Sequence, residues 1–124
     1  MRPPCELVVR YVLPAFRSLV ARELIQKYHL SQMAAAEKLG TTQAAISHYL
    51  YSKRGDKRMQ QLESIPSVQS AASDVALGIV TKKFSMTEAM LMFCKLCTIL
   101  RRQDFICDLH RGFASLPEKC SACL

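Results

Sequence analysis

Five cysteines in the last quarter of the chain are the residues best suited to do chemistry. Cys94 and Cys97 form one Cys-x-x-Cys pair, Cys120 and Cys123 form a second, and Cys107 lies between the two pairs. Zinc takes four thiolate or imidazole ligands, and an iron–sulfur cluster takes four cysteines. All five cysteines are therefore candidate metal ligands.

The spacing leaves the identity of the metal open. On a helix, Cys94 and Cys97 share one face, so both thiolates can reach one ion. They lie in an apolar, methionine-containing stretch rather than on a zinc-knuckle turn, which favours an iron–sulfur cluster over zinc. His110 and Cys5 are further candidate ligands. The competing interpretations are buried apolar cysteines at 94 and 97 and disulfides in the tail, although the absence of a signal-peptide pattern points to a reducing compartment.

A second informative stretch, residues 30 to 51, has the pattern of two short helices joined by a tight turn. Ser31 can cap the first helix, and Gly40 can supply the left-handed residue of the turn. Thr41 or Thr42 can then cap the second helix. The pattern predicts a helical hairpin whose two arms pack at a steep angle.

The side chains of this hairpin divide into an inward and an outward set. The inward set is small or apolar and can pack between the helices: Ala35, Ala36, Leu39, Ile46, Tyr49 and Leu50. The outward face of the second helix keeps Thr42, Gln43, Ala44, Ser47, His48 and Tyr51. A merely solvated face carries more Lys and Glu, whereas a helix that reads the DNA major groove needs amide and hydroxyl groups that meet base edges.

On these residues, the segment from 17 to 58 resembles the lambda-repressor-like helix-turn-helix of the phage Cro and repressor family, of the xenobiotic-response-element type. The resemblance implies that Ser31 and Gln32 hold phosphate and that Gln43, Ala44 and Ser47 face bases. Two positions depart from the motif, because it has an aliphatic residue where this chain has Thr41 and because His48 is unusual in a groove.

A longer likeness extends over more of the chain. The runs Pro4-Cys5-Glu6, Tyr11-Val12-Leu13-Pro14 and Ser52-Lys53-Arg54-Gly55, together with the cysteine-rich tail, are similar to an archaeal group of predicted transcriptional regulators. That similarity implies a regulator, and it does not imply a particular effector.

The charge distribution supports a polyanionic partner. The chain carries a formal charge of +7, and residues 1–60 hold ten basic and four acidic side chains, against seven and six in residues 61–124. Lys53 and Arg54, followed by Lys57 and Arg58, come directly after the second helix of the hairpin, where they can contact the sugar-phosphate backbone.

The remaining pattern is also helical. Apolar residues recur at helical spacing from Leu7 to about Tyr28, with Pro14 predicting either a kink or the start of the main helix. Residues 57–80 predict a short and a longer helix separated by Ile65-Pro66, and the capping box from Ser85 to Glu88 predicts a helix over 86–102. We expect an all-α helix-turn-helix bundle with a helical, cysteine-rich metal-binding extension. Met86, Met90 and Met92 are expected in core or dimer packing.

These observations give one functional expectation. Residues 1–58 form a DNA-binding domain and residues 59–124 a dimerisation and metal- or cluster-binding region, with helices over 66–102 as the dimer surface. The expected protein is a cytoplasmic homodimeric transcriptional regulator of a double-stranded operator, responsive to redox state or iron through its cluster, or carrying a structural zinc instead. No apolar run is long enough for a membrane span, so we expect no membrane partner. The residues form no recognisable catalytic arrangement, so we expect no enzyme. A helical protein-interaction adaptor is the alternative.

Overall fold

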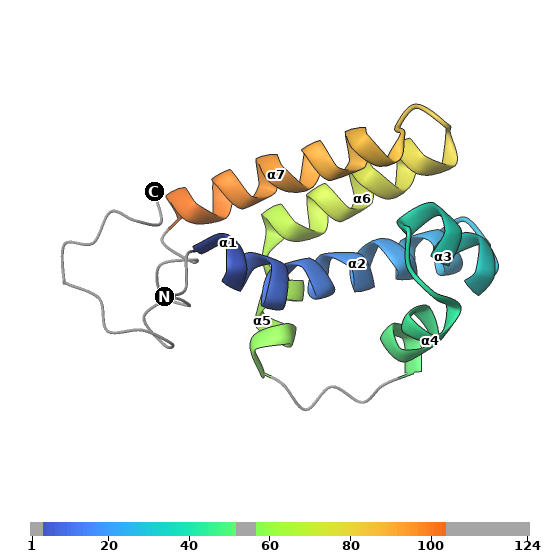
Figure 1. The fold of residues 1–124 in the computed structure, drawn as a ribbon, viewed down its shortest axis with the longest axis horizontal. Helices are drawn as coiled ribbons and strands as arrows, with labels where there is room; N and C mark the ends of the chain where they lie inside the picture. Colours follow the sequence, from blue (N-terminus) through green and yellow to red (C-terminus); the bar gives the residue numbers. More distant parts are fainter. Residues whose placement is uncertain (1–3, 52–56, 104–124) are drawn as a thin grey trace.

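The computed structural model describes residues 4–51 and 57–103, with side chains for 6–51 and 60–103 (Figure 1). Every regular element in these two ranges is a helix, so the all-α class is confirmed. None of the described helices combines the length and the apolar composition that crossing a bilayer requires.

One long helical segment opens the described chain. It consists of α1 (Pro4–Leu7), a π-helical stretch η1 (Val8–Val12), α2 (Leu13–Arg22) and a second π-helical stretch η2 (Glu23–Lys27). Pro14 is the second residue of α2, but the chain before it is already helical, so its missing N–H removes one bond of the helical ladder to the preceding turn. The stretch before it closes with the wider π bond from the Leu13 N–H to the Val8 carbonyl. The expected interruption is therefore a change of helical register just before the proline.

The hairpin predicted at 30–51 is present as α3 (Gln32–Leu39) and α4 (Gln43–Tyr51). Ser31 caps α3, because its Oγ accepts the Ala34 N–H at 3.1 Å. Gly40 has φ +66°, the left-handed conformation that ends α3. Thr42, rather than Thr41, caps α4, with its Oγ1 accepting the Ala45 N–H at 3.1 Å.

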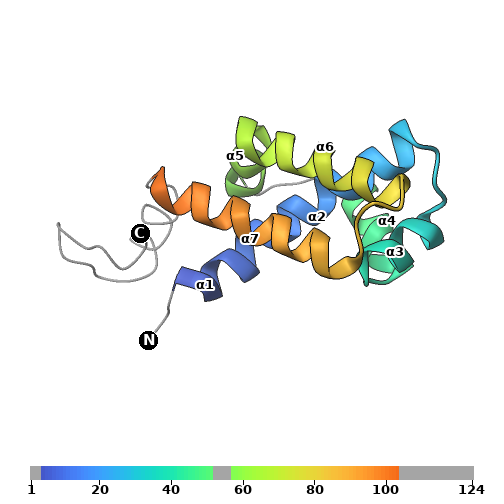
Figure 2. The ribbon, with the colours of Figure 1, turned by 90° about the horizontal axis from the view of Figure 1, so that it is seen from above.

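The second half of the described chain contains α5 (Lys57–Ser64), α6 (Pro66–Val80) and α7 (Met86–Arg102). Ile65 is extended ahead of Pro66 and separates α5 from α6, as predicted. Ser85 caps α7 by accepting the Glu88 N–H at 3.2 Å. Both views show α6 and α7 side by side as an antiparallel pair (Figures 1 and 2).

A single hydrophobic core joins the two halves, and α2 lies between α6 and α4 (Figure 1). Val20 and Leu24 of the first helical segment are fully buried, as is Ile46 of α4, and they share one cluster with Leu62 and Leu96 from beyond position 58. The described residues on either side of position 58 therefore contribute to the same core.

The methionines of α7 are expected in core or dimer packing, and two of them are not in the core. Met86 is 60% exposed and Met90 is 57% exposed, so core packing is wrong for both. Met92 is half-buried against the core. The reason is geometric: α7 packs through the face that carries Leu96 and Leu100, and Met86 and Met90 lie at the edge of that face.

Candidate nucleic-acid interface

The inward face of α4 anchors it to the rest of the fold. Ile46 is fully buried, and Ala35 and Ala36 of α3 are buried beside it. Leu39, Tyr49 and Leu50 are partly buried and pack against the same cluster. The small side chains of α3 let the two helices approach closely. All six residues predicted as the inward set therefore lie where the sequence pattern placed them.

The outward face of α4 carries short or hydrogen-bonding side chains. Thr42, Gln43, Ala44, His48 and Tyr51 are exposed, and Ser47 is half-exposed. No Asp, Glu, Lys or Arg occurs from position 43 to 51. This face can donate and accept hydrogen bonds through amide, hydroxyl and imidazole groups without the charge that solubility alone favours.

The start of α3 lies at the other predicted contact. Ser31 is exposed and Gln32 is half-buried. The Ser31 Oγ is already an acceptor for the Ala34 N–H, but its own hydroxyl proton can still be donated outward. A helix start with exposed polar side chains favours an anion such as phosphate, because the first-turn N–H groups of the helix point at it.

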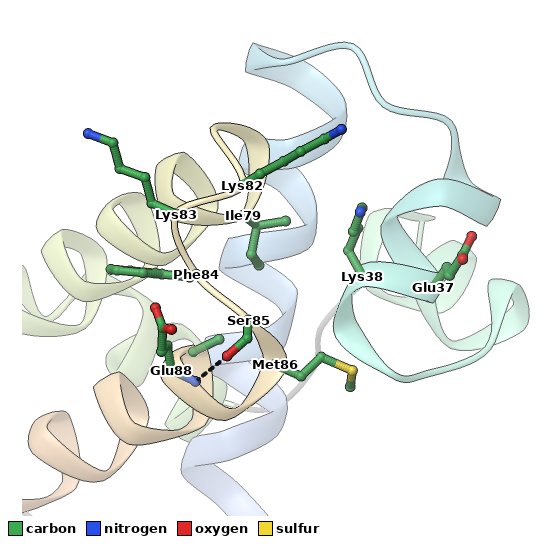
Figure 3. A pocket seen from close by; sticks show the side chains of 10 residues that line it. Glu37, Lys38, Ile79, Lys82, Lys83, Phe84, Ser85, Met86 and Glu88 are labelled. Carbon is green, nitrogen blue, oxygen red and sulfur yellow. Dashed lines mark hydrogen bonds between the residues drawn. The ribbon is translucent and has the colours of Figure 1, made fainter.

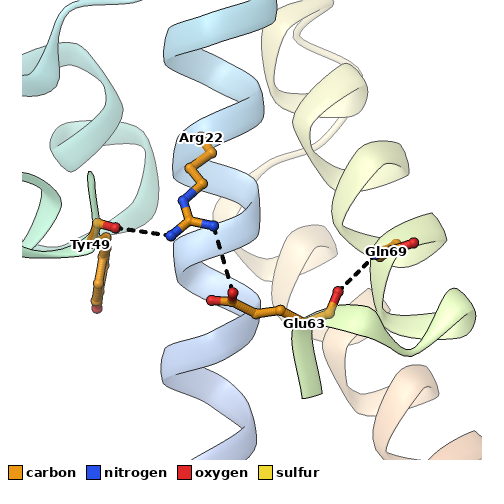
Figure 4. Close-up of polar contacts among 4 residues, drawn as sticks. All are labelled: Arg22, Tyr49, Glu63 and Gln69. Carbon is orange, nitrogen blue, oxygen red and sulfur yellow. Dashed lines mark hydrogen bonds and ion pairs between the residues drawn. The ribbon is translucent and has the colours of Figure 1, made fainter. Parts of the chain in front are cut away.

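Arg22 fixes the far end of α4, and the sequence pattern did not single it out. Its Nη2 donates to the Tyr49 carbonyl at 3.3 Å, and its Nη1 lies 3.6 Å from a carboxylate oxygen of Glu63 (Figure 4). The Gln69 side-chain amide in turn donates to the Glu63 carbonyl at 2.9 Å. The Tyr49 carbonyl belongs to the last turn of α4, where carbonyls have no partner within the helix. Arg22 therefore ties α4 to α2 and α5.

Comparison with protein-family models, curated proteins and solved structures finds no match to this chain. The resemblance to the Cro and repressor family accordingly stays a prediction. The support for it is local and comes from α3, α4 and the turn at Gly40.

The basic residues predicted to contact phosphate are described only in part. Lys53 and Arg54 lie outside the described residues. Lys57 and Arg58 form the first two positions of α5, and only their backbone is described.

The candidate metal ligands are also described only in part. Cys94 is exposed on α7, so the alternative of a buried apolar cysteine is wrong there, whereas Cys97 is half-buried and packs against the core. The other candidates lie outside the described side chains: Cys5, Cys107, His110, Cys120 and Cys123. Among the described side chains, no three His, Cys, Asp or Glu residues gather closely enough to hold an ion. Of the predicted metal ligands, only Cys94 and Cys97 have described side chains, and neither forms a disulfide within the described part of the chain.

Proposed function

We propose that this chain is a sequence-specific DNA-binding transcriptional regulator that places α4 in the major groove of double-stranded DNA. The observation that carries the proposal is the outward face of α4, which is exposed, uncharged and able to form hydrogen bonds. Gln43 and Ser47 are one helical turn apart, so both can face the same few base pairs. A glutamine amide can bind adenine through two hydrogen bonds, and a serine hydroxyl can donate or accept.

Phosphate contacts would hold α4 in register along the groove. The α3 start at Ser31 and Gln32 lies in the same hairpin as α4, and the basic run from Lys53 follows α4 in the chain. Contacts of this kind position a protein without reading sequence. Their presence makes affinity depend steeply on salt, because each neutralised phosphate releases condensed counterions.

We propose that the functional unit is a homodimer. Two α4 helices about 34 Å apart would meet successive major grooves on one side of the duplex. The α6 and α7 pair is the proposed dimer surface, because it lies across α2 from α4 and leaves the recognition face open (Figure 1). A symmetric dimer of this kind requires an operator with two inverted half-sites.

The experiment that tests DNA binding is selection of bound duplexes from a randomised pool by the purified full chain, followed by titration of the enriched site at several salt concentrations. The expected result is an enriched inverted repeat with a logarithmic salt slope of about −0.9 for each phosphate contacted. An unenriched pool, or an affinity that does not change with salt, would contradict the proposal.

We further propose that Cys94 and Cys97, with cysteines of the tail, hold an iron–sulfur cluster, and that zinc is the alternative. A labile cluster would make DNA binding report redox state or iron supply, because its loss alters the region next to the dimer surface. Metal content and the visible spectrum of protein purified without oxygen decide between the metals. Broad brown absorption with near-stoichiometric iron supports the cluster, whereas colourless protein with one zinc supports a structural role. Metal-free protein would contradict both.

A helical protein-interaction adaptor is the second candidate. The observation that favours it is the exposure of large apolar side chains on α7, where Met90 is 57% and Leu91 is 52% exposed. Substitution of Gln43 and Ser47 by alanine separates the two functions. A DNA reader loses its sequence preference, whereas an adaptor that uses α7 keeps its partner.

A further inference from the structure

An apolar groove lies between α2, the end of α3 and the first half of α7. Its volume is about 430 Å³, and its apolar walls include Leu13, Phe16, Leu39, Val75, Met90 and Phe93. The Phe16 and Phe93 rings are in contact, with centroids 5.2 Å apart. Small-molecule sites are commonly concave and apolar, with volumes of roughly 300–1,000 Å³.

The charged side chains along this groove are all cationic. Arg17 and Lys38 line it, and no Asp or Glu does. Neither cation has a hydrogen bond or ion pair with another described residue, so both are available to a ligand. An arginine fork beside an apolar wall suits a carboxylate, because it can donate two parallel hydrogen bonds to the carboxylate oxygens.

Two methionines form the rim, or lip, of the groove. Met86 and Met90 line it, yet both are more than half exposed. Met86 reaches from the start of α7 towards α3 (Figure 3), where its methyl group would lie 2.6 Å from a Cβ added to Gly40. Unbranched methionine side chains repack at low cost, so this lip can close over ligands of different shape.

A neighbouring cavity of about 440 Å³ lacks this selectivity for charge. It lies between the end of α3 and the loop that leads into α7 (Figure 3). Lys38, Lys82 and Lys83 line it together with Glu37 and Glu88, so its charged groups are of both signs, and Lys38 is shared with the groove. The groove beside α2 therefore gives the clearer chemical signal.

We propose that the groove between α2 and α7 binds a small molecule with an apolar body and a single carboxylate, with Arg17 and Lys38 holding the carboxylate. The inference does not depend on DNA binding. A ligand there would contact Leu39 in α3 and Met86 in α7 at once, so it would also stabilise the position of the hairpin relative to α7.

The first test is calorimetric titration of the full chain with hexanoate, octanoate, decanoate and octylamine. Octanoate and decanoate are expected to bind, and affinity should rise by up to about fourfold for each added methylene. Octylamine carries the same chain with the opposite charge and is expected to bind more weakly than octanoate. Equal affinity for octanoate and octylamine would overturn the assignment of Arg17 and Lys38.

The second test replaces the two cations, which are not in the buried core. The double substitution Arg17→Gln and Lys38→Gln should weaken decanoate binding about fivefold or more without weakening octylamine. The matched control, Lys27→Gln with Lys95→Gln, removes the same charge from positions outside the groove and should leave decanoate affinity unchanged. Equal weakening in both double variants would show non-specific attraction and overturn the proposal.

A second copy of the chain is the other conceivable occupant. If decanoate does not bind and Met90→Glu converts a dimer to a monomer in sedimentation, the groove is an interface between copies and the proposal is wrong. If decanoate binds and Met90→Glu weakens that binding by placing a second carboxylate at the lip, the proposal is supported.

Discussion

Helices α4 and α7 are built alike on their inner sides and differently on their outer sides. Helix α4 begins at the hydroxyl cap Thr42 and α7 at the hydroxyl cap Ser85. Each also buries an aliphatic side chain, Ile46 in α4 and Leu96 in α7. Outward, α4 has polar, uncharged groups, whereas α7 exposes apolar side chains such as Leu91. The comparison teaches that burial alone does not reveal a partner. The proposals of nucleic acid for α4 and of an apolar partner for α7 rest instead on the chemistry of the two exposed faces.

The largest effects should come from the two inner faces, where the helices are equivalent. Ile46→Ala and Leu96→Ala should each lower the free energy of unfolding by about 2–5 kcal/mol, because each leaves a cavity in a shared core. Urea unfolding followed by circular dichroism measures both. The control is Leu77→Ala, because Leu77 is 49% exposed and its truncation should lower the free energy of unfolding much less. A variant that unfolds in two separate transitions would show that α4 and α7 belong to independent units.

The next effect concerns how α7 is placed against α6. A Cβ at Gly78 would overlap the ring of Phe84, whose backbone N–H also donates to the Gly78 carbonyl at 3.0 Å. Gly78→Ala should therefore cost about 1–3 kcal/mol of stability through overpacking. Adding Phe84→Leu should recover part of that loss, and thermal unfolding measures it. If Gly78→Ala is as stable as the parent protein, the close contact of the α6–α7 turn is wrong.

The third prediction concerns base reading by α4. Gln43→Ala should remove about 1–3 kcal/mol of discrimination at one base pair of the selected operator, without changing the free energy of unfolding. Competition binding with single-base operator variants measures it. Gln26→Ala removes another exposed amide, in η2, and should leave discrimination intact. Uniform weakening on every sequence would instead assign Gln43 to the backbone.

Local signals in the sequence predicted most of the helices and their boundaries. The Ser85 capping box and the apolar stretch after it predicted α7 with its observed bounds, and Gly40 marked the turn because a left-handed residue there favours glycine. Arg22 could not be found in this way, since its partners Tyr49 and Glu63 are distant in sequence. Helical periodicity assigns a residue to a polar face and says nothing of what that face contacts.

The groove and the exposure of Met86 and Met90 could not be predicted from the sequence for a related reason. Met86 and Met90 fit an apolar helix pattern, and only the packing angle between α7 and its neighbours decides which apolar residues are covered. Likewise, Arg17 and Lys38 come from different helices, and folding brings them to the same groove.

Smaller effects are expected at the caps, where the helical hairpin and α7 are again alike. Ser31→Ala and Ser85→Ala should each cost about 1 kcal/mol, because each leaves one first-turn N–H without its side-chain acceptor. Chemical denaturation measures both. Replacement by Asp at either position should restore stability, since aspartate caps as well as serine does. If Ser31→Ala weakens DNA binding and Ser85→Ala does not, Ser31 also has the phosphate contact proposed for it.

The smallest change in the free energy of unfolding is expected on substitution of Arg22. The local effect on the last turn of α4 should nevertheless be measurable. The Arg22 side chain is 31% exposed and the ion pair is long at 3.6 Å, so a double-mutant cycle of Arg22→Gln with Glu63→Gln should give a coupling of at most about 1 kcal/mol. Arg22 nevertheless holds the Tyr49 carbonyl at the end of α4, so Arg22→Gln should loosen that end. Amide hydrogen exchange should then quicken in the last turn of α4 and stay unchanged in α7. Faster exchange in both helices would mean that Arg22 supports the whole core rather than the orientation of α4.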